Sequence, residues 1–216
     1  MKLDSDKAYL QQLIAEGEHQ QQDFKFEISD ARKIARSLSA FSNTDGGRLL
    51  IGVKDNGRIA GVRSEEEIYM IEAAAKLYCK PQVEITVQNF QVEGKCVLIA
   101  EIPRADKKPV QAQDESGRYL AYVRVADENI LATPVHLAIW RQKNSPRGEL
   151  VKYSKREQLL LDYLALHHEI SIAHYCRLAR IPYRVAIEHI ARFVRFGILD
   201  IGFEGHRFCY RLKQSE

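Results

Sequence analysis

The segment Ala40-Phe41-Ser42-Asn43-Thr44-Asp45-Gly46-Gly47 constrains the fold of this chain more than any other part of its sequence. Before it, residues 30–43 read as a helix, because their apolar side chains recur at helical spacing. After it, residues 48–53 contain the apolar run of a buried strand. Two adjacent glycines permit positive φ and close backbone approach. The segment therefore predicts a sharp turn from a core helix into a core strand, with Ser29 as a candidate helix cap.

The same glycines could also contact a ligand. A phosphate-binding loop of the Walker type ends in Gly-Lys-Ser/Thr, whereas Gly47 is followed here by Arg48, and no such sequence occurs in the chain. Nucleotide hydrolysis is therefore not predicted. A structural turn and a ligand contact remain as alternatives for this segment.

The rest of the first 140 residues mixes helices and strands without strict βα repetition. Helices are predicted over residues 4–16 and 64–79, and strands over 83–92, 96–102 and 119–125. The pairs Asn56-Gly57 and Glu93-Gly94 predict two tight turns, the first leading into a returning strand at residues 59–62. The predicted fold class is α+β, with a mixed domain at residues 1–140.

The C-terminal part has a different pattern. Residues 141–153 are polar, contain Pro146 and Gly148, and are the best candidate for a linker. Helices are then predicted over 155–167, 171–180 and 183–196, the last beginning at Pro182, and two short β-prone runs follow at 199–203 and 207–212. Three helices and a hairpin are the element order of a winged helix, which predicts such a domain at residues 154–216.

The third of these helices would be the recognition helix of a winged helix. Burial of its apolar face leaves three arginines nearer the surface, Arg184, Arg192 and Arg195, where they could contact bases or phosphates. His206 and Arg207, at the tip of the predicted wing, could reach a groove or the backbone. Glu188 argues against this reading because a carboxylate repels phosphate. The alternative is a winged helix that only packs on the first domain or mediates dimerisation.

Bulk properties restrict the class of protein. No apolar run approaches the roughly 18 residues of a membrane span, and the N-terminus has no signal-peptide core. The four cysteines are far apart, which favours reduced thiols in a cytoplasmic protein. Residues 1–145 carry 20 Lys and Arg against 21 Asp and Glu, and residues 146–216 carry 12 against 8. This modest asymmetry suits a C-terminal part that meets phosphates.

An ordered set of motifs in the first domain resembles a known family. The set consists of Glu18-x4-Asp23-Phe24-Lys25, the segment at residues 40–47, the run at 50–61, Lys108-Pro109-Val110, and Tyr122-Val123-Arg124-Val125 through Asn129. Over roughly residues 10–135 the chain resembles the Schlafen-type, AlbA-like DNA-binding domain. The resemblance implies nucleic-acid binding, and a winged helix commonly follows this domain in the family.

Some members of that family bind a divalent metal through three acidic residues and cleave RNA. The resemblance places this acidic trio at Glu18, Asp23 and Asp55, with Asp23 where the family usually has Glu. Hard carboxylate oxygens suit Mg²⁺ or Mn²⁺, which could activate water, and Lys25 could hold the scissile phosphate. Asp55 is equally an ordinary turn residue beside Asn56-Gly57. Arg124 could line a basic groove or pair with an acid such as Glu128.

The leading functional prediction is thus a nucleic-acid-binding regulator of bacterial type, with DNA favoured over RNA as its partner and no membrane contact. It has no certain cofactor, and a homodimer is possible. The alternatives are a Schlafen-like endoribonuclease that uses Mg²⁺ or Mn²⁺ through the acidic trio, and an assembly module that touches no nucleic acid. The sequence does not indicate the target sequence, the preference between DNA and RNA, whether the acidic trio is catalytic, the effector or the oligomeric state.

Overall fold

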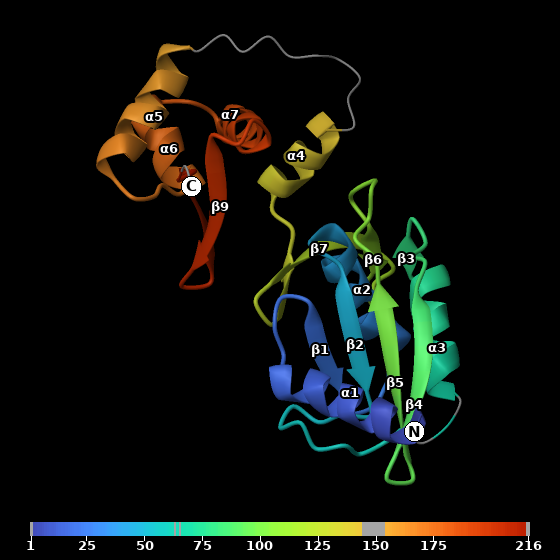
Figure 1. Cartoon of the computed structure of the whole chain (residues 1–216). Helices are drawn as coiled ribbons and strands as arrows, with labels where there is room; N and C mark the ends of the chain where they lie inside the picture. Colours follow the sequence, from blue (N-terminus) through green and yellow to red (C-terminus); the bar gives the residue numbers. More distant parts are fainter. Residues whose placement is uncertain (1, 63, 65, 144–153, 215–216) are drawn as a thin grey trace. The chain divides into compact units, whose positions relative to one another are not determined.

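The computed structural model describes residues 2–62, 64, 66–143 and 154–214 (Figure 1). The fold class is α+β, as predicted. The chain divides into two compact units, Met1–Leu131 and Ala132–Glu216. This division precedes the expected boundary at residue 140, and the expected linker at 141–153 lies mostly outside the described residues.

The first unit contains a four-stranded sheet in the order β1-β2-β5-β4. Strand β1 (Gln22–Lys25) runs parallel to β2 (Gly47–Ile51), whereas β5 (Lys95–Ile102) is antiparallel to both β2 and β4 (Thr86–Val92). Helix α1 (Lys2–Glu16) covers one face of this sheet through Leu10 and Leu13, which pack with Phe24, Leu50 and other strand residues. The other face packs on α2 (Ala31–Asn43).

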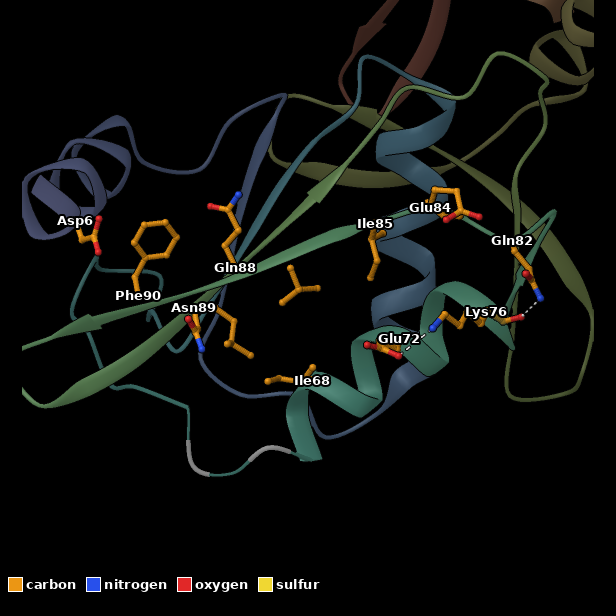
Figure 2. A pocket seen from close by; sticks show the side chains of 13 residues that line it. Asp6, Ile68, Glu72, Lys76, Gln82, Glu84, Ile85, Gln88, Asn89 and Phe90 are labelled. Atoms are coloured by element: carbon orange, nitrogen blue, oxygen red, sulfur yellow. Dashed lines mark hydrogen bonds and ion pairs between the residues drawn. The ribbon is translucent and has the colours of Figure 1, made fainter. Parts of the chain in front are cut away.

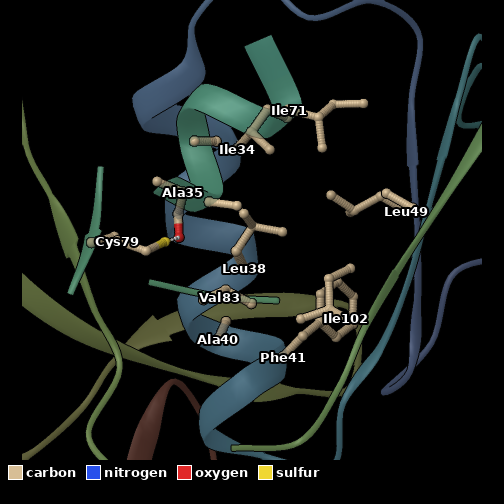
Figure 3. Close-up of a cluster of buried hydrophobic side chains, with 14 of the residues drawn as sticks. Ile34, Ala35, Leu38, Ala40, Phe41, Leu49, Ile71, Cys79, Val83 and Ile102 are labelled. Atoms are coloured by element: carbon tan, nitrogen blue, oxygen red, sulfur yellow. Dashed lines mark hydrogen bonds between the residues drawn. The ribbon is translucent and has the colours of Figure 1, made fainter. Parts of the chain in front are cut away.

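Helix α2 is the centre of the unit, because it also packs on a second sheet. That sheet has the order β3-β6-β7-β8, formed by β3 (Cys79–Lys80), β6 (Gln111–Gln113), β7 (Tyr119–Val125) and β8 (Glu128–Leu131). Figure 3 shows the apolar side of α2, with Leu38 and Phe41, facing Leu49 and Ile102 of the first sheet. Helix α3 (Glu66–Lys76) adds Ile71 to the same core.

The second unit has four helices and one hairpin within its described residues. These are α4 (Pro134–Lys143), α5 (Lys155–Leu166), α6 (Ile172–Ala179), α7 (Tyr183–Arg195), β9 (Leu199–Glu204) and β10 (Arg207–Leu212). Ser154 and Glu157 form a reciprocal capping box at the start of α5. Ile170, between α5 and α6, forms a β-bridge with Tyr210 of β10.

Several local expectations need correction. Asp30, not Ser29, caps α2, because its carboxylate accepts the Arg32 N–H. The turn at residues 54–58 forms, but the predicted returning strand is only an isolated bridge between Val53 and Ile59. Pro182 is the residue before α7 and not its first residue.

The described residues contain neither a disulfide nor a membrane-spanning helix. The four cysteines, Cys79, Cys96, Cys176 and Cys209, are free thiols. In the part of the chain that the structure describes, no helix is both long and apolar enough to span a membrane.

Candidate nucleic-acid interface

The turn between α6 and α7 carries a cluster of exposed cations. Helix α6 ends at Ala179 and is followed by its cap residue Arg180, which has a left-handed backbone (φ 50°). Arg177 lies in the last turn of α6. Tyr183 and Arg184 begin α7, and the Tyr183 side chain is 50% exposed. All three arginines are exposed, and none forms an ion pair with a residue that the structure describes. We call Arg177, Arg180, Tyr183 and Arg184 the α6–α7 turn cluster.

Arg192 and Arg195 do not belong to this surface, contrary to the expectation from sequence. Arg192 is half-buried and forms an ion pair with Glu157 of α5, a residue that is itself 2% exposed. Burial alone would raise the pKa of Glu157, but hydrogen bonds from Ser154 and the Arg192 charge lower that pKa below its ordinary value. Arg195 donates to the Gln142 carbonyl at 3.0 Å and lies over the Phe196 ring. Both guanidinium groups therefore hold helices together.

Helix α4 explains why the exposed face of α7 is small. Its apolar residues Val135, Ala138 and Ile139 are buried, and its polar end contacts α7. Glu188 forms an ion pair with Arg141 and accepts a hydrogen bond from Gln142 at 2.9 Å. The carboxylate that argued against nucleic-acid contact is thus directed at α4. Of the three α7 arginines predicted to face nucleic acid, only Arg184, in the first turn of the helix, is exposed to solvent.

The hairpin tip supplies two further polar side chains. His206 has a positive φ of 58° in the turn between β9 and β10, and its ring contacts Phe203 edge-on. Arg207 begins β10, and both His206 and Arg207 are exposed. Their exposure is compatible with the predicted contact to a groove or backbone.

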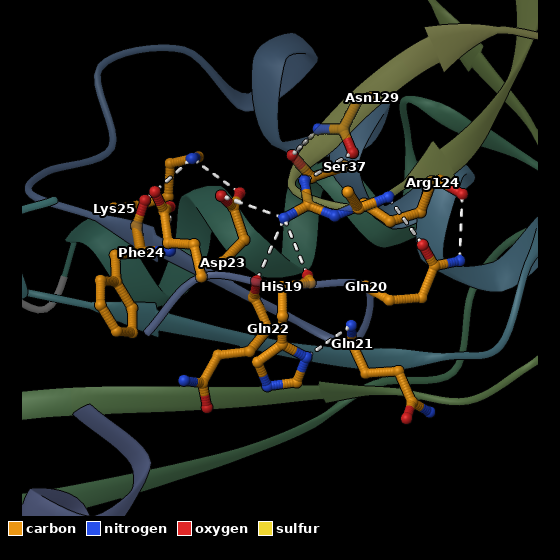
Figure 4. Close-up of polar contacts among 12 residues, drawn as sticks. His19, Gln20, Gln21, Gln22, Asp23, Phe24, Lys25, Ser37, Arg124 and Asn129 are labelled. Atoms are coloured by element: carbon orange, nitrogen blue, oxygen red, sulfur yellow. Dashed lines mark hydrogen bonds and ion pairs between the residues drawn. The ribbon is translucent and has the colours of Figure 1, made fainter. Parts of the chain in front are cut away.

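Two members of the acidic trio, Glu18 and Asp23, lie close enough in the first unit for Asp23 to affect the Glu18 carboxyl. Asp23 is buried (4% exposed) on β1, and Lys25 forms an ion pair with it at 2.6 Å. Glu18 accepts the Phe24 N–H at 2.9 Å. Burial, followed by the hydrogen bond with Asp23, raises the pKa of the Glu18 carboxyl. Lys25 thus neutralises Asp23, and Figure 4 shows this pair beside Arg124.

The third acid, Asp55, is exposed in the turn at residues 54–58. Across the described residues, which include all three acids, no group of three or more His, Cys, Asp and Glu side chains is placed to hold a metal ion. The acidic trio predicted as a Mg²⁺ or Mn²⁺ site is not brought together as one. Glu18, Asp23 and Lys25 instead form a charge cluster at the start of β1.

Arg124 requires the clearest correction, because it is 2% exposed and cannot line a groove. Its guanidinium donates to the carbonyls of His19 (3.3 Å) and Gln22 (3.1 Å) and to the Asn129 side chain (3.0 Å). It also forms an ion pair with Asp23 at 3.5 Å, not with Glu128, and stacks over Phe41 at 4.9 Å. Arg124 therefore ties β7 to the residues around β1 (Figure 4).

The segment at residues 40–47 is explained by the same kind of contacts. The Asn43 side chain donates to the carbonyls of Val110 (2.7 Å) and Tyr122 (2.9 Å) and accepts the Val110 N–H (2.8 Å). The Thr44 hydroxyl accepts the Arg124 N–H at 2.8 Å. The side-chain groups of Asn43 and Thr44 are thus occupied within the protein, which favours the structural turn over the ligand contact.

The sequence analysis did not single out Arg177 and Arg180 as members of the α6–α7 turn cluster. It placed both residues in the helix predicted over residues 171–180. Two arginines in the last residues before a tight turn were the available signal. Helix α4 was also missed, although Val135, Ala138 and Ile139 have the i, i+3, i+4 spacing of a buried helix face.

Residues 18–133 match the sequence model of the family described as Schlafen, AlbA_2, which is more than half of the chain. None of the curated proteins matches the chain. Among solved structures, the chain is similar to the DIP2311 protein of Corynebacterium diphtheriae (19% identity, TM-score 0.45). That alignment covers 68% of this chain and 35% of the Corynebacterium protein, about a third of its length. The N-terminal domain of a RecG-related protein from Nitrosomonas europaea is also similar (20% identity, TM-score 0.43), with 67% and 95% covered.

Proposed function

Because this chain belongs to the Schlafen AlbA_2 family through residues 18–133, we propose that it is a nucleic-acid-binding protein whose second unit, a winged helix, docks on duplex DNA. The observation that carries the proposal is the α6–α7 turn cluster, in which an exposed tyrosine and three arginines with no ion pair to a described residue surround the start of α7. Arginine forks engage phosphate and guanine in bidentate fashion, and the first turn of a recognition helix is where such contacts are made.

The charge balance of the second unit supports this assignment. Residues 132–216 carry 14 Lys and Arg against 8 Asp and Glu, a net charge of +6, whereas residues 1–131 carry 18 against 21, a net charge of −3. Electrostatic attraction to phosphates is therefore concentrated in the unit that carries the turn cluster. Arg207 and His206 add a second contact from the hairpin tip, as the wing of a winged helix does.

A regulatory role follows as the finer part of the proposal. The chain combines a family domain with a helical DNA-binding unit, which is the arrangement of a transcriptional regulator. The Glu18–Asp23–Lys25 cluster is not part of the proposed DNA contact, because Lys25 already neutralises Asp23 and the described acids form no metal group.

The first prediction tests the turn cluster through a double variant, Arg180→Ala/Arg184→Ala. Each arginine that contacts a phosphate releases about one counterion, so losing two contacts lowers the slope of log K against log salt by roughly 1.8. We expect duplex affinity to fall about tenfold or more at moderate salt. Fluorescence anisotropy with a labelled duplex, measured across a salt titration, gives both quantities, and single-stranded RNA serves as a competitor.

The matched control is Lys155→Ala/Arg156→Ala, which removes two exposed charges from α5 in the same unit. This control should keep the parent salt slope. Equal affinity and slope in the turn-cluster variant and the parent would refute the assignment. Absence of any nucleic-acid binding at low salt would favour an assembly module instead.

A further inference from the structure

Strand β4 is an open edge of the first sheet. Among the described strands it pairs only with β5, because it is the last strand in the order β1-β2-β5-β4. Val92 and Lys95 flank the two-residue turn Glu93-Gly94, both of which have positive φ (55° and 74°). Such a hairpin begins with a hydrogen-bonded pair, and hydrogen-bonded pairs alternate along an antiparallel ladder. The backbone groups of Val87, Asn89 and Gln91 therefore point away from β5, toward the open edge.

The sequence of β4 lacks the features that normally protect an edge strand. It reads Thr-Val-Gln-Asn-Phe-Gln-Val, with no charged residue, no proline and no glycine. Soluble proteins usually guard an exposed edge with lysine, proline or a bulge, because unpaired N–H and C=O groups attract another strand. A regular seven-residue edge without these devices is suited to pairing with one.

A groove of about 710 Å³ runs beside this edge. Figure 2 shows that it is lined by Gln88 and Phe90 from one face of β4 and by Asn89 from the other. Ile68 and Glu72 of α3 line it on one side, and Asp6 of α1 lines it on another. Residues of both strand faces share one cavity, so the space lies along the strand edge, where an added strand would lie.

We propose that β4 is a dimerisation edge that pairs antiparallel with β4 of a second copy of this chain, about a two-fold axis at Asn89. This register pairs Asn89 with Asn89 of the second copy, and Val87 with its Gln91. All three outward-facing residues then form hydrogen-bonded pairs, which gives about six backbone hydrogen bonds. Shifting the axis to residue 88 leaves Gln91 without a partner inside β4.

The chemistry of the strand favours a second copy as the occupant. A two-fold interface must be self-complementary, so any charge on the axis would face itself. The axis residue here is an uncharged amide, and neighbouring amides in paired strands can hydrogen-bond to each other. The register places no like charges opposite each other within β4, because the strand has none.

The second prediction uses the axis position. Asn89 is exposed, so Asn89→Lys leaves the core intact but places two ammonium groups opposite each other across the axis, which opposes pairing. In analytical ultracentrifugation of the full chain, the parent is expected at twice the chain mass of 24.8 kDa and the variant at that mass. Gln88→Lys adds the same charge on the opposite face of β4. In the proposed register residue 88 does not lie opposite residue 88 of the second copy, so this variant should remain a dimer.

Mixing two variants of opposite charge at residue 89 tests whether this residue faces its own copy across the interface. Asn89→Asp should also be monomeric alone, whereas an equimolar mixture of Asn89→Lys and Asn89→Asp should recover the dimer, because opposite charges then face each other. Far-UV circular dichroism verifies that each variant is folded. A parent chain that is monomeric at high micromolar concentration overturns the proposal and leaves the edge to a strand of another protein. A dimer that persists unchanged in Asn89→Lys overturns it as well.

Discussion

Burial distinguishes the arginines that stabilise this chain from those that could bind a ligand. Arg124 and Arg192 are cations that sequence reasoning placed on nucleic acid, and both are instead neutralised by acids inside a unit. Removing either arginine would leave the buried carboxylate that it pairs with uncompensated, which costs about 3–5 kcal/mol. Arg180 and Arg184 are exposed and form no ion pair within the described ranges, so their guanidinium groups are available to a ligand.

The third prediction concerns His136, whose pKa burial lowers to about 4. The unfolded chain binds the His136 proton more tightly than the folded chain does. The stability contributed by the neutral, buried His136 side chain is therefore fully present above about pH 6.5 and is lost as pH falls toward 4. The free energy of unfolding of the second unit should therefore fall by up to about 1.4 kcal/mol per pH unit over this range. Trp140, the only tryptophan, lies 6.0 Å from His136 and reports the unfolding by fluorescence.

His136→Phe should reduce that slope without removing it, because burial also lowers the pKa of His189 in the same unit. The exposed His168→Phe is the control and should leave the slope unchanged. An identical pH dependence in His136→Phe and the parent would contradict the assignment to His136.

At the scale of elements, the turn from α2 into β2 is the most demanding piece of backbone. Gly46 has a φ of 73°, and a Cβ added there would lie 2.9 Å from the backbone nitrogen of Arg104 and the carbonyl oxygen of Ile102. Gly94 has nearly the same φ of 74° but nothing within 4 Å of its added Cβ. A substitution at Gly94 therefore introduces backbone strain alone, whereas one at Gly46 introduces the same strain together with a steric clash.

The fourth prediction follows from this comparison. Gly94→Ala should cost about 1 kcal/mol of strain, and Gly46→Ala about 2–4 kcal/mol, because the clash is with backbone that cannot move aside. Urea unfolding followed by far-UV circular dichroism measures both losses, while Trp140 fluorescence follows the second unit separately. Equal losses would show that the close approach at Gly46 relaxes at little cost.

Hydrophobic periodicity and turn residues predicted those helices and turns that depend on local sequence. Helix α2 with Ile34, Leu38 and Phe41 buried, and the turn at Glu93-Gly94, follow from periodicity and turn chemistry and are confirmed. The contacts of Arg124 with His19 and Gln22 could not be predicted, because these residues lie about a hundred positions away and are brought close only by packing. The trio Glu18, Asp23 and Asp55 failed as a metal group for the same reason, since spacing does not place side chains in space.

At the scale of the whole molecule, dimerisation and nucleic-acid binding would reinforce each other. Two copies joined through β4 carry two α6–α7 turn clusters, and the second contact then occurs at a high effective concentration. Linked sites can gain about 10²–10⁴ in affinity if their geometry allows both to engage. The two proposals therefore predict a dependence on duplex length that neither predicts alone.

The fifth prediction compares the parent with Asn89→Lys on two duplexes, one long enough for two copies and one too short. The variant should bind the long duplex at least tenfold more weakly than the parent and the short duplex equally well. Gln88→Lys again controls for the added charge. Equal weakening on both duplexes would indicate that residue 89 affects the binding unit itself and not avidity.

The side chain of Asn43 has a consequence for the dynamics of the first unit. It holds the backbone of Val110 and Tyr122 in the second sheet, while its own helix packs on the first sheet. The two sheets cannot separate from each other without breaking these bonds in the protein interior. Amide hydrogens on both sides of α2 should consequently exchange with solvent in one concerted opening, so that the two sheets behave as a single foldon.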